Sequence, residues 1–223
     1  MALGAALQSA VGMGLALVVV PMLAMIDTAL IPGPMLLASV GLCFGMAWSG
    51  RNAIDWKLLR PALLGLGLGT AVGAALLAAM PGSSLGKLFA VLILAAIAIS
   101  MVGLHPPATR ATCAIGGVAS GIMGTMAGIH GPAIALMLQK EEPRRVRALL
   151  GAYFFLGYCI SVAALWAVGV FTLTSAGLGL ALIPGTALGF FLGPWLARFV
   201  DQRRLRIAIL AISGVSALLL LLR

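Results

Sequence analysis

The chain alternates between long apolar stretches and short polar connections. Two of the apolar stretches, 2–26 and 111–139, are interrupted by glycine and proline, whereas the others are continuous. The continuous stretches are 35–49, 58–79, 85–102, 148–168, 173–196 and 207–222. Apolar runs of about 20 residues are typical of membrane-spanning helices. The pattern therefore predicts an all-α integral membrane protein.

The clearest interruption lies in the second half of 111–139. Glycine and proline are the two least favourable residues in a helix interior, and proline fits best in the first turn of a new helix. We therefore predict two half-helices with a break between them, and a similar break at Gly12-Met13-Gly14 in 2–26. Unwound backbone at membrane depth is tolerated only where protein covers it or where it lines a water-filled cavity. The second break contains Gly124, Gly128, His130, Gly131 and Pro132.

The basic residues distinguish two topologies. If all eight stretches crossed the membrane, five Lys and Arg would lie on one side and nine on the other. If the two interrupted stretches are re-entrant hairpins, 12 of the 14 share one side. Cytoplasmic loops carry an excess of Lys and Arg, so the second topology is favoured. It places the loops 50–57, 140–147 and 198–206 in the cytoplasm.

The two halves of the chain resemble each other weakly. Three glycines at helical spacing in 58–79 recur in 173–196 at an offset of 120, and Gly12 recurs as Gly128 at an offset of 116. We predict two repeats, 1–105 and 108–223, each with one broken hairpin (2–26 or 111–139) and three transmembrane helices. An odd number of crossings inverts the second repeat relative to the first. Inverted repeats with broken helices at the midplane are typical of secondary transporters. The recurring glycines are Gly65, Gly69 and Gly73, and then Gly185, Gly189 and Gly193.

Composition excludes several classes of function. Hydrophobic residues make up 62% of the chain and charged residues 9%, and the net charge is +9. The basic residues lie in short connections between apolar stretches, which indicates membrane topology and lipid headgroups, not nucleic acid. The cysteines Cys43, Cys113 and Cys159 form no metal-ligand spacing. We expect no metal, no cofactor and no enzymatic activity.

The breaks favour an anionic substrate. Helix N-termini present unpaired N–H groups and partial positive charge, and glycine permits close approach to them. No acidic residue lies in the predicted spans, so a cation would find no counter-charge there. For His130, a neutral structural role, direct anion contact and proton coupling all stay open. The candidate substrate-binding residues are Gly12, Met13, Gly14, Gly124, Thr125, Gly128, Ile129, His130, Gly131, Pro132, Ser39 and Tyr153.

The order and spacing of these motifs resemble a known family. The chain resembles the TauE/SafE sulfite exporters, which are permeases for sulfur-containing anions, over nearly its whole length. The motifs that carry the resemblance are Gly12-Met13-Gly14 with Pro21, residues 52–57 before the glycine helix, Gly121 to Gly124, Gly128 to Pro132, Leu196 to Arg198, and Arg203 to Arg206. The family usually has a glycine triplet at each hairpin tip. Here Leu15 and Ala16 follow Gly14, and His130 stands where glycine is usual.

The resemblance implies a bacterial inner-membrane transporter. It implies a small anion such as sulfite or an organosulfonate as the substrate, and export is the common direction in the family. Alternating access between the repeats is the expected mechanism, with protons as a candidate coupling ion and a homodimer as a candidate assembly. A passive anion channel of the same fold and a membrane assembly factor without transport activity are the alternatives.

Overall fold

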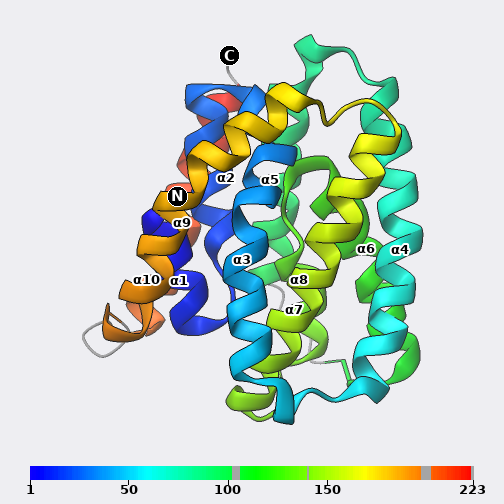
Figure 1. Cartoon of the computed structure of the whole chain (residues 1–223), viewed down its shortest axis with the longest axis vertical. Helices are drawn as coiled ribbons and strands as arrows, with labels where there is room; N and C mark the ends of the chain where they lie inside the picture. Colours follow the sequence, from blue (N-terminus) through cyan, green and yellow to red (C-terminus); the bar gives the residue numbers. More distant parts are fainter. Residues whose placement is uncertain (102–105, 140, 197–201, 222–223) are drawn as a thin grey trace.

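The described part of the chain is entirely helical, as the sequence predicts (Figure 1). The computed structural model describes residues 1–101, 106–139, 141–196 and 202–221. The α-helices are α1 Ala2–Val11, α2 Leu15–Ile26, α3 Gly33–Ser49, α4 Trp56–Ala79, α5 Leu85–Met101, α6 Arg110–Ala127, α7 Gly131–Met137, α8 Pro143–Ala167, α9 Leu173–Leu196 and α10 Gln202–Leu221. Short 3-10 turns lie at Thr28–Leu30, Arg51–Ala53 and Gly82–Ser84.

Five helical segments in the described residues are long and apolar enough to cross a membrane. They contain α3, α4, α5, α8 and α9. The sixth expected span, 207–222, overlaps α10. The chain is therefore a multi-pass membrane protein by the length and composition of its helices.

Each interrupted stretch folds back on itself. In a continuous helix, Gly4 and Val19 would lie roughly 22 Å apart and Gly116 and Met137 roughly 32 Å apart, at 1.5 Å per residue. A methyl group on Gly4 would instead overlap the side chain of Val19, and one on Gly116 would lie 3.0 Å from Cγ of Met137. Neither stretch is therefore a single straight helix. Figure 1 shows the chain reversing between α1 and α2 and again between α6 and α7.

The glycine faces of α4 and α9 pack against the first half-helices of the two broken stretches. A methyl group at Gly69 of α4 would overlap the carbonyl oxygen of Val118 in α6. One at Gly189 of α9 would overlap the carbonyl oxygen of Ala2 in α1. Small residues are what allow helix backbones to approach this closely in lipid. Each half of the chain therefore holds the broken stretch of the other half.

A second face of α4, about 100° around the helix from the glycines, is apolar and exposed. Leu64 and Leu68 are 74% and 68% exposed, and Val72 and Leu76 continue the same stripe at four-residue spacing. An exposed leucine stripe on a helix whose other face is buried fits contact with lipid tails. The α4 helix thus contacts protein through its glycines and faces lipid with its leucines.

One sequence expectation is corrected here. The charged stretch 140–147 was predicted to be a loop, but α8 already begins at Pro143. Proline lacks an N–H and suits the first turn of a helix, where no N–H is needed. The arginines of this stretch therefore project from helical backbone, which fixes their spacing. Similarly, α10 begins at Gln202, five residues before the expected start of its span.

Some expectations lie outside the described residues. These are His105, Lys140 and the first part of the loop 198–206, up to residue 201. The described connections show which helix ends lie together. The α3–α4 connection and the starts of α6 and α8 lie at the same end of the bundle, which is the lower end in Figure 1.

Candidate functional site

In the second break, a glycine ends the first half-helix and another begins the second. Gly128 ends α6 with φ 78°, in the left-handed region, and its N–H donates to the carbonyl of Gly124 at 2.7 Å. Only glycine adopts this conformation without strain. Three residues later Gly131 begins α7, with Pro132 in the first turn. The backbone therefore leaves one helix and starts another within three residues.

The first break has the same construction. Gly12 ends α1 with φ 95°, and Gly14 precedes α2 with φ 122°. The N–H of Gly12 donates to the carbonyl of Gln8, and Gly14 provides no side-chain cap for α2. The N–H groups of the first turn of a helix have no intrahelical partner, so the start of α2 has donors to offer.

Both breaks line one small cavity. Gly14 from the first break and Gly131 from the second border the same space, whose volume is about 30 Å³. A cavity needs roughly 10–15 Å³ to hold one water molecule, so this one has room for about two. Its other lining residues are Gln8, Met13, Ala16, Leu17, Ser100, Pro132, Phe154 and Tyr158. The structure therefore brings together Met13, Gly14, Gly131 and Pro132, which sequence reasoning selected independently.

Among the described residues, no charged side chain lines the cavity. Its polar side chains are those of Gln8, Ser100 and Tyr158, and the first two already hydrogen-bond elsewhere. The amide nitrogen of Gln8 donates to Sγ of Cys43 at 3.2 Å, and the hydroxyl of Ser100 donates to the carbonyl of Ala96 at 2.7 Å. The charge of an anion in this space would therefore be met by backbone amides and neutral dipoles.

The imidazole of His130 does not line this cavity. Its ring packs against Gly124 of α6, where a methyl group would overlap it, and it lies 3.5 Å from the position that a methyl group would take on Gly157 of α8. Its Nε2 is 3.1 Å from the hydroxyl of Ser161. The ring is 1% exposed and meets Tyr158 edge-on at 5.1 Å between centroids. His130 therefore fills the interface between α6 and α8, where two glycines make room for it.

A buried chain of hydroxyls extends from His130. Ser161 is 3.0 Å from Thr125, whose hydroxyl donates to that of Thr70 at 3.1 Å. This chain links α8, α6 and α4. The Nδ1 atom of His130 and the hydroxyl of Tyr153 are buried and make no hydrogen bond within the described residues.

The remaining candidates lie in the surrounding packing. Ile129 is fully buried, and the Ser39 hydroxyl donates to the carbonyl of Met35 in its own helix at 2.8 Å. Gly12 and Gly128 shape the breaks but do not border the cavity. Thr125 and Tyr153 lie with the hydroxyl chain and the aromatic cluster of α8, not at the cavity.

Sequence reasoning missed two aromatic lining residues, Phe154 and Tyr158. Tyr158 is 2% exposed and lies five residues after Tyr153 in the same apolar stretch. The hydroxyl of Tyr158 could have identified it as a candidate, because a buried tyrosine hydroxyl in a membrane helix needs a hydrogen-bond partner.

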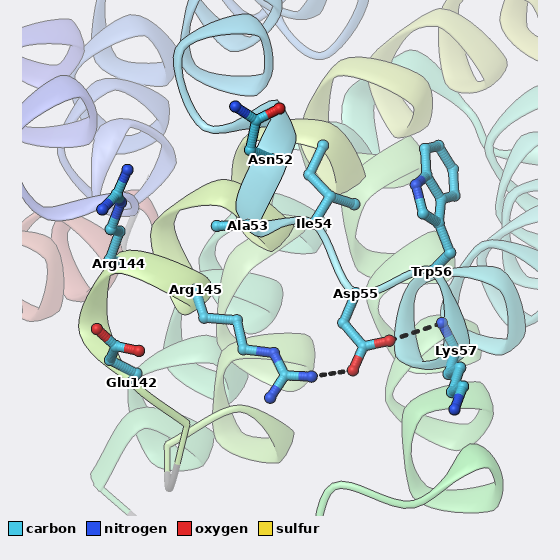
Figure 2. Close-up of a pocket in the computed structure, with 9 residues that line it drawn as sticks. All are labelled: Asn52, Ala53, Ile54, Asp55, Trp56, Lys57, Glu142, Arg144 and Arg145. Carbon is cyan, nitrogen blue, oxygen red and sulfur yellow. Dashed lines mark hydrogen bonds and ion pairs between the residues drawn. The ribbon is translucent and has the colours of Figure 1, made fainter.

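The end of the bundle that carries the α3–α4 connection also holds an ion-pair cluster. Arg145 of α8 pairs with Asp55 and, at 3.0 Å, with Glu141. Asp55 also accepts from the backbone N–H of Lys57 at 2.8 Å and so caps α4 (Figure 2). Asp55, Lys57 and Arg145 border an open pocket of about 600 Å³. Within the described residues, no three His, Cys, Asp or Glu side chains are grouped to hold a metal ion.

Comparison with known proteins gives one match. Residues 1–220 match the protein family described as Sulfite exporter TauE/SafE. Searches of curated proteins and of solved structures found no match.

Proposed function

Because this chain belongs to the TauE/SafE sulfite exporter family, we propose that it carries sulfite or a related sulfur-containing anion through the cavity between the two breaks. The family comprises transmembrane transporters, not enzymes, and its name indicates export of sulfite or a related anion. The substrate-binding residues, the alternating-access mechanism and the sidedness given below are our proposal.

The observation that carries this proposal is the position of Gly14 and Gly131 on one cavity. Each lies where a helix begins, next to a break of the chain. Backbone amides at such a point attract anions, and the missing side chain lets the anion reach them. The α2 helix has 12 residues and α7 has seven, so α2 supplies the larger part of the dipole.

Magnitudes indicate that the anion stays partly hydrated. A helix N-terminus contributes about 0.3–2 kcal/mol to the binding of a negative charge. Full desolvation of an isolated ion costs tens of kcal/mol in the idealised limit. Two helix ends cannot offset that cost. Gln8 and Tyr158 on the cavity wall, together with retained water, would supply the remaining hydrogen bonds.

The small size of the cavity favours alternating access. A space for about two water molecules is a closed form of the site, so the substrate must enter by a movement of the surrounding helices. The two broken stretches are held by different halves of the chain, and a movement of one half against the other would open the cavity on one side at a time.

An internal repeat supports this mechanism. The contact of Gly69 with Val118 corresponds to that of Gly189 with Ala2, at the offsets of 120 and 116 noted in the sequence. The hydrogen bond from Thr125 to Thr70 corresponds to the one from Ser9 to the backbone of Phe190, at the same two offsets. Corresponding contacts at shared offsets are expected when two halves have the same fold.

Transport by purified protein in liposomes is the direct test. We expect saturable efflux of radiolabelled sulfite from protein-containing vesicles, with counterflow that responds to a pH jump. In Gly131→Val the added side chain points toward the cavity and Phe154, since a methyl group at this position would lie 3.7 Å from that ring. We expect loss of transport with normal insertion. The matched control is Gly67→Val, because nothing lies within 4 Å of a methyl group at Gly67.

The alternatives give different results in the same assay. Non-saturable flux without counterflow would indicate a passive anion channel. Absence of any sulfite flux in correctly folded protein would favour an assembly factor. Unchanged kinetics in Gly131→Val would remove the cavity from the transport path.

A further inference from the structure

A third pocket, of about 360 Å³, lies between α1, α3, α8 and α9. Arg144 and Arg147 of α8 border it, and Ser9 of α1 and Ser49 of α3 lie on other walls. Phe190 and Phe191 of α9 form its apolar side. The pocket is about ten times larger than the cavity at the breaks, and it is large enough for a hydrated oxyanion.

The charge around this pocket is of one sign. No carboxylate of the described residues borders it, and neither arginine forms an ion pair with another described residue. The neighbouring pocket differs, because Asp55 and Glu142 border it together with Arg144 and Arg145. Figure 2 shows that Arg145 points to Asp55, whereas Arg144 points away from that pair. Within the described residues, the guanidinium groups of Arg144 and Arg147 therefore have no ion-pair partner.

The two serine hydroxyls of this pocket already donate hydrogen bonds within the protein. Ser9 donates to the carbonyl of Phe190 at 3.0 Å, and Ser49 donates to the carbonyl of Gly45 at 2.8 Å. The side-chain donors free for a ligand are therefore the guanidinium N–H groups. Arginine presents a planar set of donors that suits oxyanions and binds them with two hydrogen bonds at once.

This pocket adjoins the first break. A methyl group on Gly12 would lie 3.5 Å from Cα and 3.6 Å from Cγ of Arg147, so the backbone of the break packs on the stem of this arginine. The following residues, Met13 and Gly14, border the inner cavity. The break 12–14 thus separates a basic outer pocket from the uncharged inner cavity.

We propose that the pocket between α1, α3, α8 and α9 is an outer binding site at which Arg144 and Arg147 hold a small oxyanion before it passes the 12–14 break. The inference rests on the proposed transport function and names the residues that collect its substrate. The outer site concentrates the anion by charge, and the inner cavity admits it by backbone amides. A charged outer site raises the local concentration of anions and loses this effect at high salt.

Binding to the purified full-length protein tests the site directly. Sulfite would be titrated by calorimetry at low salt in a neutral detergent without added lipid. We expect Arg147→Gln and Arg144→Gln each to weaken sulfite binding about tenfold, since each removes a charge-assisted contact. Arg51→Gln is the matched control, because Arg51 lies at the same end but stacks on Trp48 with 4.8 Å from Cζ to the ring centroid. Equal affinity of the wild type and both pocket variants would overturn the proposal.

Transport separates this inference from the function on which it rests. In liposomes we expect Arg147→Gln to raise the KM for sulfite about tenfold at low salt. We expect its maximal rate to stay close to that of the wild type. The KM of the wild type should rise with ionic strength more steeply than that of the double variant Arg144→Gln, Arg147→Gln. No transport by the wild type would refute the proposed function, whereas normal transport with an unchanged KM in both variants would refute the outer site alone.

A lipid phosphate has the same chemistry as a free oxyanion, so the lipid is varied as well. The titration would be repeated in nanodiscs of phosphatidylcholine with and without phosphatidylglycerol. Sulfite binding in both lipids, sensitive to Arg147→Gln, supports the outer site. Arginine-dependent capture of phosphatidylglycerol that abolishes sulfite binding would assign the pocket to a headgroup and overturn the proposal.

Discussion

Arg145, in the first turn of α8, forms an ion pair with Asp55, which precedes α4 and lies 90 residues earlier in the chain. The pair joins the two connections that a topology of eight crossings would place on opposite faces of the membrane. A hydrocarbon core is about 30 Å thick, far beyond the reach of two side chains. The contact therefore favours the topology in which 111–139 enters and leaves on the same side.

Cross-linking tests this contact in membranes. With Cys159 replaced by alanine, Asp55→Cys and Arg145→Cys together should be joined by a short bismaleimide, because the two side chains meet. The control pairs Asp55→Cys with Ser83→Cys, which lies in the connection after α4, at its other end. A cross-link of the control pair with equal yield would contradict the arrangement.

Labelling from one side of the membrane tests sidedness. Cysteines at Asn52 and Arg144 should react with a membrane-impermeant maleimide only in inside-out vesicles, because basic loops stay cytoplasmic. Cysteines at Ser83 and Thr172 should react only in right-side-out vesicles. Labelling of position 144 from the side that labels position 83 would reject the re-entrant arrangement.

The position of His130 makes a prediction about Gly124. Alanine there would overlap the imidazole ring, so we expect Gly124→Ala to destabilise the protein by about 1–3 kcal/mol. In a His130→Ala background, the same change from Gly124 to Ala should cost much less, because the ring that causes the overlap is gone. Gly67→Ala, with open space around it, is the control. Thermal unfolding in detergent compares these variants with the wild type, and an equal cost of Gly124→Ala in both backgrounds would contradict this packing.

The proposed repeat predicts matched effects at matched positions. Gly69→Ala and Gly189→Ala would each drive a methyl group into backbone of the other half, so we expect similar losses of about 1–3 kcal/mol. Gly86→Ala should destabilise the protein much less, because nothing lies within 4 Å of the position that its methyl group would take. The yield of folded protein and its unfolding temperature provide the measurement. A large effect at one site without the other would argue against equivalent halves.

Much of the fold follows from local rules. Apolar length predicted the long helices, and the glycines of the two breaks predicted where helices end, as at Gly12 and Gly128 with their positive φ values. The boundary of α8 was placed too late because hydropathy marks where a helix enters lipid, not where its backbone begins. Pro143 carried the missing signal.

The candidate site was predicted only in part. Gly14 and Gly131 were selected because unwound backbone needs a cavity, and the structure has one beside both. His130 belongs to the same break, yet its ring turns to Ser161 and away from the cavity. The direction of a side chain depends on the space that other helices leave, and here that space comes from Gly124 and Gly157.

The sequence alone determined that this chain is a helical membrane protein with two breaks, since hydropathy, glycine and proline act on the backbone nearest to them. The tertiary structure decided which parts meet: α6 against α4, α1 against α9, Arg145 with Asp55, and Arg147 beside Gly12. These contacts join residues far apart in the chain. They arise from the close packing of whole helices, which no local pattern of residues contains.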